Sequence, residues 1–405
     1  MVKGRIVHLI ATAAVAAGLI AGCGSSSSSS SSSSSAASSS ASSSSSTTGM
    51  ASSSSGVSAG VAEAQKLVAQ WMAPPAWHGP TAPVDIAKAK GKSVYFINLT
   101  EEIPALHEWG VVMAQQLALA GVSTQKCDAK GSPNGIILCL QQALAAKPSA
   151  IVALALDTKF IASYIAKAKS EGIKFITGQT GTPGIPTIPG DDAEVTFDYG
   201  QVGRILADWY VATSHCSSAP QIITSTSSRQ PSLAEVAGIE SEVKRLCPGM
   251  TLPSVQNVLI PDWPTELPTL TRSLLTSNPK LQYLLPLYDG MTIYMNPAIE
   301  GIHRSVPVEE ASFNGTPVVM QNELAKPSPL AADIGGPNEW YGVALADQVL
   351  RVLTGAPVVA SENVPLRLFT RANIGSINVH ANEATWYGSV NPICEYHKLW
   401  GLPCS

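Results

Sequence analysis

Residues 150–177 read AIVALALDTKFIASYIAKAKSEGIKFIT and contain a complete strand–helix–strand unit. The apolar run at 150–156 is typical of a strand that is buried on both faces of a sheet. The segment 158–170 has the spacing of an amphipathic helix, Gly172 ends it, and residues 173–177 are again largely apolar. Because parallel strands need a crossover connection of this kind, the segment predicts a parallel sheet covered by helices.

The same alternation extends in both directions. Earlier in the chain, strands are predicted at 93–98 and 122–127 and helices at 104–120 and 133–146. A loop rich in Pro and Gly at 178–190 precedes a second series, with strands at 195–197, 221–224, 255–259, 281–285 and 310–313 and helices at 199–213, 231–246, 264–277, 291–301 and 338–354. We therefore expect an α/β fold with two Rossmann-like lobes, each with a parallel sheet, joined by a multi-strand hinge with a ligand cleft between them.

The domain boundaries follow from these series. We expect lobe 1 to comprise residues 92–200 and about 317–340, and lobe 2 residues 201–316 and about 341–365. An N-terminal helix and a proline-rich wrap are expected at 61–91, and a C-terminal tail with a disulfide at 366–405.

The N-terminus has the features of an export signal. Lys3 and Arg5 precede an apolar stretch at 6–20, which is too short for a comfortable membrane span, and small residues lead to Cys23. The tetrapeptide IAGC at 20–23 resembles the bacterial lipobox, in which the cysteine becomes the lipidated N-terminus. We expect residues 1–23 to be a lipoprotein signal and Cys23 to anchor the protein on the extracytoplasmic face of the cell membrane. A plain signal peptide with an incidental cysteine is the alternative.

A serine-rich segment follows at 24–60 and has almost nothing to bury. Such a composition predicts a disordered tether, which as a flexible coil would reach roughly 30–40 Å. Removing Cys23 from the count leaves six cysteines in an oxidising compartment. Pairing neighbours in sequence gives three disulfides, although other connectivities remain open: Cys127–Cys139, Cys216–Cys247 and Cys394–Cys404.

Several classes of function are not supported. The net charge is −4, and no basic stripe follows the N-terminus, so we expect no nucleic-acid partner. The chain has no CxxC pair and no spacing that completes a metal site, so we expect no metal. It also lacks a G-x-S-x-G elbow, an H-E-x-x-H motif, a phosphate loop and a dinucleotide fingerprint. We therefore expect neither an enzyme nor a cofactor.

A series of motifs carries a family resemblance. They are FDYG at 197–200, LLTSNP at 274–279, YDGM at 288–291, SFNGTP at 312–317 and GVALADQVL at 342–350. Their order over about 92–355 resembles the type I periplasmic-binding-protein superfamily, specifically its sugar-binding, ribose-binding-protein-like branch.

The resemblance implies a monomeric solute-binding lipoprotein of an ABC importer. It would capture a small molecule, a sugar or sugar-like compound, between its lobes and deliver it to the permease. Two alternatives stay open: a ligand sensor for a membrane receptor, and a binder of a non-sugar ring compound.

The resemblance also implies which residues bind the ligand, since they follow strands or lie near the hinge: Asn98, Glu101, Glu102, Asp157, Gln179, Thr180, Arg229, Trp263, Tyr288, Asp289, Asn314, Asn338 and Trp340. Asp157 and Asn338 are equally suited to cap the helices that follow them, and Arg229 equally suits a surface loop. Tyr288 stands where sugar binders often carry Asn, and Asn314 replaces their Asp. The site is therefore expected to be more aromatic than a ribose site.

Overall fold

The computed structural model describes residues 48–181, 183 and 188–404. The predicted signal peptide, the lipid-anchor residue Cys23 and the tether as far as residue 47 lie outside the described residues. No helix in the described part of the chain is long and apolar enough to span a membrane.

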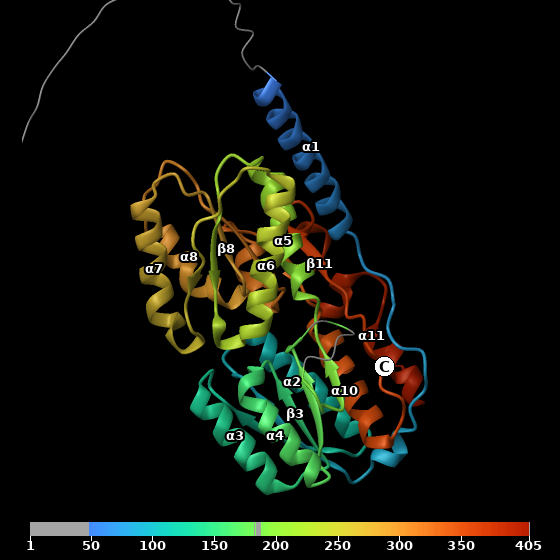
Figure 1. Ribbon diagram of the computed structural model, residues 1–405. Coiled ribbons are helices and arrows are strands. Elements are labelled where there is room, and N and C mark those ends of the chain that lie inside the picture. The colour runs from blue at the N-terminus through green and yellow to red at the C-terminus, as the bar shows by residue number, and fades with distance from the viewer. Residues whose placement is uncertain (1–47, 182, 184–187, 405) are drawn as a thin grey trace, which may run out of the picture. The chain divides into compact units, whose positions relative to one another are not determined.

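The first lobe is built on a parallel sheet (Figure 1). Its strand order is β2-β1-β3-β4-β5, with β1 (Ser93–Asn98), β2 (Ser123–Asp128), β3 (Ala150–Leu154), β4 (Lys174–Gly178) and β5 (Ala193–Val195). The connecting helices are α2 (Pro104–Leu119), α3 (Pro133–Ala146) and α4 (Thr158–Ser170). Every residue of β3 is buried, as expected for a central strand covered on both faces.

The second lobe repeats this arrangement. Its sheet has the order β11-β10-β9-β8-β6-β7, with β6 (Gln221–Thr224), β7 (Gln256–Asn257), β8 (Tyr283–Pro286), β9 (Glu309–Asn314), β10 (Leu330–Gly335) and β11 (Arg367–Thr370). The pairing is parallel except between β10 and β11. The longer helices are α5 (Tyr199–Ser214), α6 (Arg229–Leu246), α7 (Trp263–Ser277) and α8 (Thr292–Glu300). The predicted fold class is therefore confirmed.

Short helical segments complete the elements between the strands. They are η2 (Thr226–Ser228), η3 (Ile260–Asp262), η4 (Asp289–Met291), α9 (Pro317–Val319), the π-helical η5 (Met320–Leu324), η6 (Ile374–Ser376) and η7 (Glu383–Tyr387).

The predicted division of the chain after residue 316 is wrong. We expected 317–340 in lobe 1, but β10 extends the second sheet, where Asp333 pairs in register with Ser312 of β9. We expected 341–365 in lobe 2, but α10 (Asn338–Thr354) packs against α2, β4 and β5 of lobe 1. Nearly every position of α10 is buried, so this helix needs apolar partners on all sides, which is typical of a central helix. The chain then returns to the second sheet as β11.

The N-terminal helix is longer than predicted. Helix α1 runs over Thr48–Trp71, so it includes residues 48–60 that we assigned to the tether. Serine and alanine are compatible with a helix that packs on a folded surface. The helix packs on α5 and α6, and Gly60 lies so close to the Leu246 carbonyl that a Cβ atom there would be only 2.0 Å from its oxygen.

The predicted wrap joins α1 to the first lobe. The backbone N–H of Val84 donates to the Leu399 carbonyl at 2.9 Å, just before η1 (Ile86–Ala89). The ring of Trp77 stacks on Trp340 with 5.3 Å between ring centroids and meets Tyr396 edge-on. The wrap is thus packed against α10 and the C-terminal helix.

The C-terminal tail contains α11 (Pro392–Trp400), which packs on α10. Asp347 accepts from the Arg351 guanidinium at 2.5 Å and from Trp400 Nε1 at 2.7 Å. Arg351 also donates to the Ala82 carbonyl at 2.9 Å. This buried ion pair therefore connects the closing helix, the wrap and the tail. The disulfides of the structure are those expected: Cys127–Cys139, Cys216–Cys247 and Cys394–Cys404.

The N-terminus of α10 is capped by a side chain from another part of the chain. The backbone N–H of Asn338 donates to Glu383 Oε1 at 2.6 Å, and Asn338 Nδ2 donates to the same atom at 3.2 Å. Burial raises the pKa of Glu383 to about 8, against a value of 4.5 for an ordinary glutamate. The folded protein therefore retains a proton that the unfolded chain releases.

The burial of Glu383 makes stability depend on pH, although the hydrogen bond from Asn338 acts in the opposite direction. Between about 4.5 and 8 the folded state holds more protons than the unfolded one, so Glu383 lowers the free energy of unfolding as pH rises through that window. The variant Glu383→Gln keeps the acceptor oxygen and removes the titration. Urea unfolding at about pH 5 and about pH 8 should show a smaller loss of stability for Glu383→Gln than for the wild type. Identical pH slopes for the two proteins would contradict this assignment.

Candidate ligand-binding site

The carboxyl ends of the two sheets face each other, and residues that follow these strands make direct contacts between the lobes. Gln230, at the start of α6, donates through Nε2 to Thr158 Oγ1 at 2.6 Å and to Asp157 Oδ1 at 3.3 Å. A Cβ atom on Gly131 would lie 3.2 Å from the Ile260 side chain, so the lobes also touch through apolar groups. The lobes are therefore in contact at the edge where α/β proteins of this kind bind ligands.

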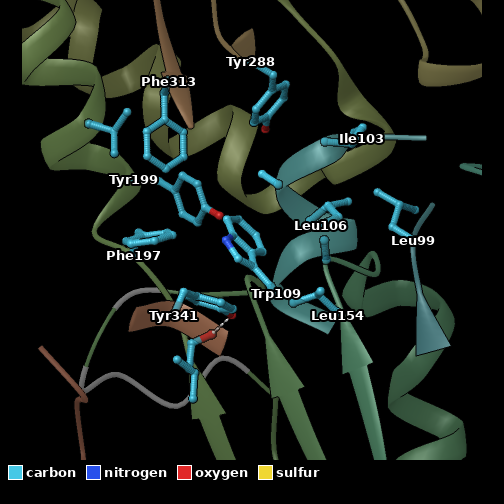
Figure 2. Packing of buried hydrophobic residues seen from close by; sticks show 14 of the residues in the cluster. Leu99, Ile103, Leu106, Trp109, Leu154, Phe197, Tyr199, Tyr288, Phe313 and Tyr341 are labelled. Atoms are coloured by element: carbon cyan, nitrogen blue, oxygen red, sulfur yellow. Dashed lines mark hydrogen bonds between the residues drawn. The ribbon is translucent and has the colours of Figure 1, made fainter. Parts of the chain in front are cut away.

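An aromatic cluster occupies the junction between the lobes (Figure 2). We define it as Trp109 from α2, Tyr341 from α10, Phe197 and Tyr199 at the crossing into α5, and Phe313 from β9. The centroid distances are 4.4 Å for Trp109–Tyr341, 5.1 Å for Phe197–Tyr341 and 5.5 Å for Phe197–Phe313. All of these side chains are buried. The cluster gives the junction an extensive apolar lining.

Tyr288 and Trp263 add a second aromatic pair from lobe 2. Their rings stack with centroids 6.5 Å apart, and the hydroxyl of Tyr288 hydrogen-bonds to Ser232 Oγ at 2.8 Å. In Figure 2 this hydroxyl points to the side where Trp109 and Leu106 lie. Burial raises the pKa of Tyr288 well above its usual value, so the hydroxyl stays protonated and can donate or accept. Trp263 Nε1 donates to the Val258 carbonyl at 3.1 Å, which fixes its ring in lobe 2.

Three predicted residues of lobe 1 lie at strand ends next to the junction. Asn98 ends β1 and donates to Glu101 Oε1 at 2.8 Å and to the Leu106 carbonyl at 3.2 Å. Asp157 accepts from the Lys159 N–H at 3.1 Å, so it caps α4 as the alternative reading proposed. Gln179 Oε1 accepts from the hydroxyl of Tyr199.

The electrostatics of Asp157 reflect two opposing effects. Burial alone would raise its pKa, but hydrogen bonds from Lys159 and Gln230 outweigh that effect and lower it. The carboxylate is therefore ionised while it holds Gln230 of the other lobe.

Two predicted residues of lobe 2 bond to each other. Asp289 accepts from the Thr316 N–H at 2.7 Å, from Thr316 Oγ1 at 2.8 Å and from Asn314 Nδ2 at 3.4 Å. Burial raises the pKa of Asp289 to about 6, although the bonds from Thr316 act in the opposite direction. These contacts join the turns after β8 and β9, so they hold the lobe 2 edge of the site in place.

Other predicted residues lie outside this arrangement. Arg229 and Glu102 are exposed, and Glu101 is half-buried beside His107. Thr180 is buried, and its hydroxyl donates to Glu194.

Two further predictions are corrected by the packing. Trp340 is fully buried against Trp77, under the wrap, rather than at the junction. The side chain of Asn338 does not cap α10, because Glu383 bonds the free backbone N–H. Instead Asn338 Oδ1 accepts from Trp109 Nε1 at 2.7 Å, and so it orients a ring of the aromatic cluster.

Buried polar atoms at the strand ends lack partners within the described chain. These atoms include Asn98 Oδ1 at the end of β1, Gln179 Nε2 directly after β4, and the hydroxyl oxygens of Thr224 and Ser225 at the end of β6. A buried polar group without a hydrogen bond costs about 1–3 kcal/mol, so native proteins rarely keep one without a reason. Here the unpaired atoms come from the facing strand ends of both lobes.

The sequence reasoning missed several residues at this junction. Trp109, Tyr199 and Tyr341 lie in predicted helices with no predicted role in binding, and Ser225 lies just beyond the predicted strand 221–224. The one available signal was their position, since Tyr199 begins a hinge crossing and Ser225 directly follows a strand. Among the described residues, no group of His, Cys, Asp and Glu side chains is arranged to hold a metal ion.

Comparisons with known proteins agree with this geometry. The model of the periplasmic binding protein domain family matches residues 94–307, which is more than half of the chain. No curated protein sequence matches the chain significantly.

Solved structures show the same fold at low sequence identity. An ABC transporter solute-binding protein from Agrobacterium vitis with bound allitol is 20% identical, with a TM-score of 0.63 over 71% of this chain and 98% of that one. A 5-methylthioribose-binding protein from Thermotoga lettingae is 15% identical, with a TM-score of 0.64 over 79% and 95% of the two chains. The Caulobacter myo-inositol-binding protein is 20% identical, with a TM-score of 0.60 over 71% and 95%. The chain belongs to the periplasmic binding protein domain family and has its type I fold.

Proposed function

We propose that this protein is an extracytoplasmic solute-binding lipoprotein. It captures a sugar or sugar-like small molecule between its lobes and delivers it to the permease of an ABC importer. The observation that carries this proposal is the junction itself, where facing strand ends present unpaired polar atoms beside a wall of aromatic rings.

The chemistry of the junction suits a polyhydroxylated ring. Aromatic faces cover the C–H faces of such a ring, while a few fixed polar groups bond its hydroxyls. Asn98 Oδ1 and Ser225 Oγ are available for this purpose from opposite lobes. Solved proteins with the same fold contain bound allitol, 5-methylthioribose and myo-inositol, which supports the same class of ligand here.

Contact between the lobes supports delivery to a permease. Gln230 joins lobe 2 to Asp157 and Thr158 of lobe 1, so hydrogen bonds between the lobes, at the edge where the strands end, hold the conformation seen here. A ligand that bonds both lobes would shift the population toward this state. A permease could then distinguish the closed, loaded protein from the open one.

Binding can be tested with Asn98. A panel containing allitol, myo-inositol, D-arabinose and 5-methylthioribose should include at least one compound that raises the melting temperature of the purified protein. For that compound, Asn98→Ala should weaken affinity about tenfold, the effect of losing one hydrogen bond of about 1.4 kcal/mol. Isothermal titration calorimetry measures the change.

The control variant is Asn278→Ala. Asn278 is exposed at the C-terminus of α7, so its replacement should leave the affinity unchanged. If no compound of the panel binds, the carbohydrate proposal is wrong.

The lipid anchor can be tested separately. In a bacterial host fed with labelled palmitate, the wild-type protein should incorporate the label and fractionate with membranes. Cys23→Ala removes the acceptor thiol and should lose the label, while Ser25→Ala, two residues away, should retain it. Labelling that persists in Cys23→Ala would refute lipidation at this cysteine.

A further inference from the structure

The second lobe contains a carboxylate that the hydrogen bonds described so far do not use. Glu235 lies on α6, one turn after Ser232, and is fully buried. Neither of its carboxylate oxygens has a hydrogen-bond partner within the described chain. Because Ser232 bonds the Tyr288 hydroxyl, this turn of α6 adjoins the aromatic pair of lobe 2.

Two tyrosines of the site are the electrostatic neighbours of Glu235. Negative charge on Glu235 contributes to the raised pKa of Tyr199 and of Tyr288, after the larger effect of their own burial. Both rings therefore lie close to the carboxylate. Tyr199 belongs to the aromatic cluster, and its hydroxyl reaches Gln179 of lobe 1. The charge of Glu235 thus acts on one tyrosine from each of the two aromatic groups of the junction.

Isolating a carboxylate in this way is unfavourable. Removing an ionised group from water costs several kcal/mol unless a partner replaces the lost solvation. Burial accordingly raises the pKa of Glu235 well above its usual value. Within the described residues, no buried basic side chain bonds it: Arg351 bonds Asp347, Arg367 bonds backbone carbonyls, and His397 bonds Gln116.

Other buried carboxylates near the strand ends differ from Glu235. Asp157 pairs with Lys159 at 3.1 Å, and Asp289 accepts from Thr316. Glu310 also has no hydrogen bond to its oxygens, but it lies near the amino end of β9, away from the carboxyl ends that form the site. Asp333 on β10 also has two unpaired oxygens and is an electrostatic neighbour of Asp289. Glu235 is therefore one of two unpaired carboxylates near the junction, and the one whose charge acts on Tyr199 and Tyr288.

We infer that the ligand brings a protonated amino group to Glu235, so that the preferred ligands are amine-bearing sugars or cyclitols. This inference rests on the proposed function and specifies its substrate class. Because burial favours the protonated form of Glu235, the side chain would release its proton to solvent on binding, and the ammonium group would then form a charge-assisted hydrogen bond with the carboxylate. The faces of Tyr199 and Tyr288 would add cation–π attraction in a dry environment. A neutral hydroxyl at the same place would gain neither of these charge-dependent interactions.

The experiment compares matched pairs of ligands that differ by one amino group. Glucose and glucosamine, galactose and galactosamine, mannose and mannosamine, and myo-inositol and an inosamine are titrated into the full mature protein by calorimetry. We expect at least one amine to bind at least about tenfold more tightly than its hydroxyl parent, as a hydrogen bond to a charged group does.

Two variants locate the effect. Glu235→Gln keeps the size of the side chain and removes its charge, so it should fold and should lose most of the preference for the amine. Glu310→Gln removes an equally buried and equally unpaired carboxylate remote from the site, so it should keep the preference. Circular dichroism and urea unfolding confirm that each variant is folded.

The outcomes separate this inference from the proposed function. If every neutral parent that binds does so as tightly as its amine, or if Glu235→Gln retains the preference, the amine inference is overturned while the binding function stands. The proposed function itself fails if the wild-type protein binds no member of these pairs and no compound of the panel of sugars and polyols described above.

Discussion

The burial of α10 is the constraint on which the two-lobe arrangement depends. This helix packs against α2 and the first sheet, yet the strands before and after it, β10 and β11, belong to the second sheet. Its apolar side chains cannot leave lobe 1 without exposing a large hydrophobic surface. The chain is therefore forced to cross between the lobes on both sides of the helix. The crossing before the helix lies beside the aromatic cluster, since a Cβ atom on Gly336 would be 2.7 Å from the Phe197 ring.

Local pattern predicted most of the elements but not their assembly. The apolar run before Asp157 and the helix after it are visible in the sequence, and the structure has both. The pairing of β10 with β9 is a contact between distant segments that neither periodicity nor composition specifies. Residues 317–335 were therefore placed in the wrong lobe, although α10 itself was predicted at its observed bounds.

The candidate site was predicted unevenly for a similar reason. Asn98, Gln179 and Tyr288 follow strands, and parallel strands place such residues at one edge of a sheet, so their positions could be inferred. Trp109 and Glu235 lie on helices, where the sequence indicates which positions are buried but not whether they face the core or the opposite lobe. The aromatic character of the junction was anticipated from Tyr288 and Trp263, whereas the residues that supply most of it were not.

Helix α1 packs on lobe 2, at one end of α6. Gly60 packs at Leu246, the last residue of α6, while Gln230 at the other end of that helix bonds the opposite lobe. The ends of an 18-residue helix are about 27 Å apart. Helix α1 consequently packs on lobe 2 at the end of α6 that is remote from the contact between the lobes, so α1 itself leaves the edge where the two lobes meet uncovered.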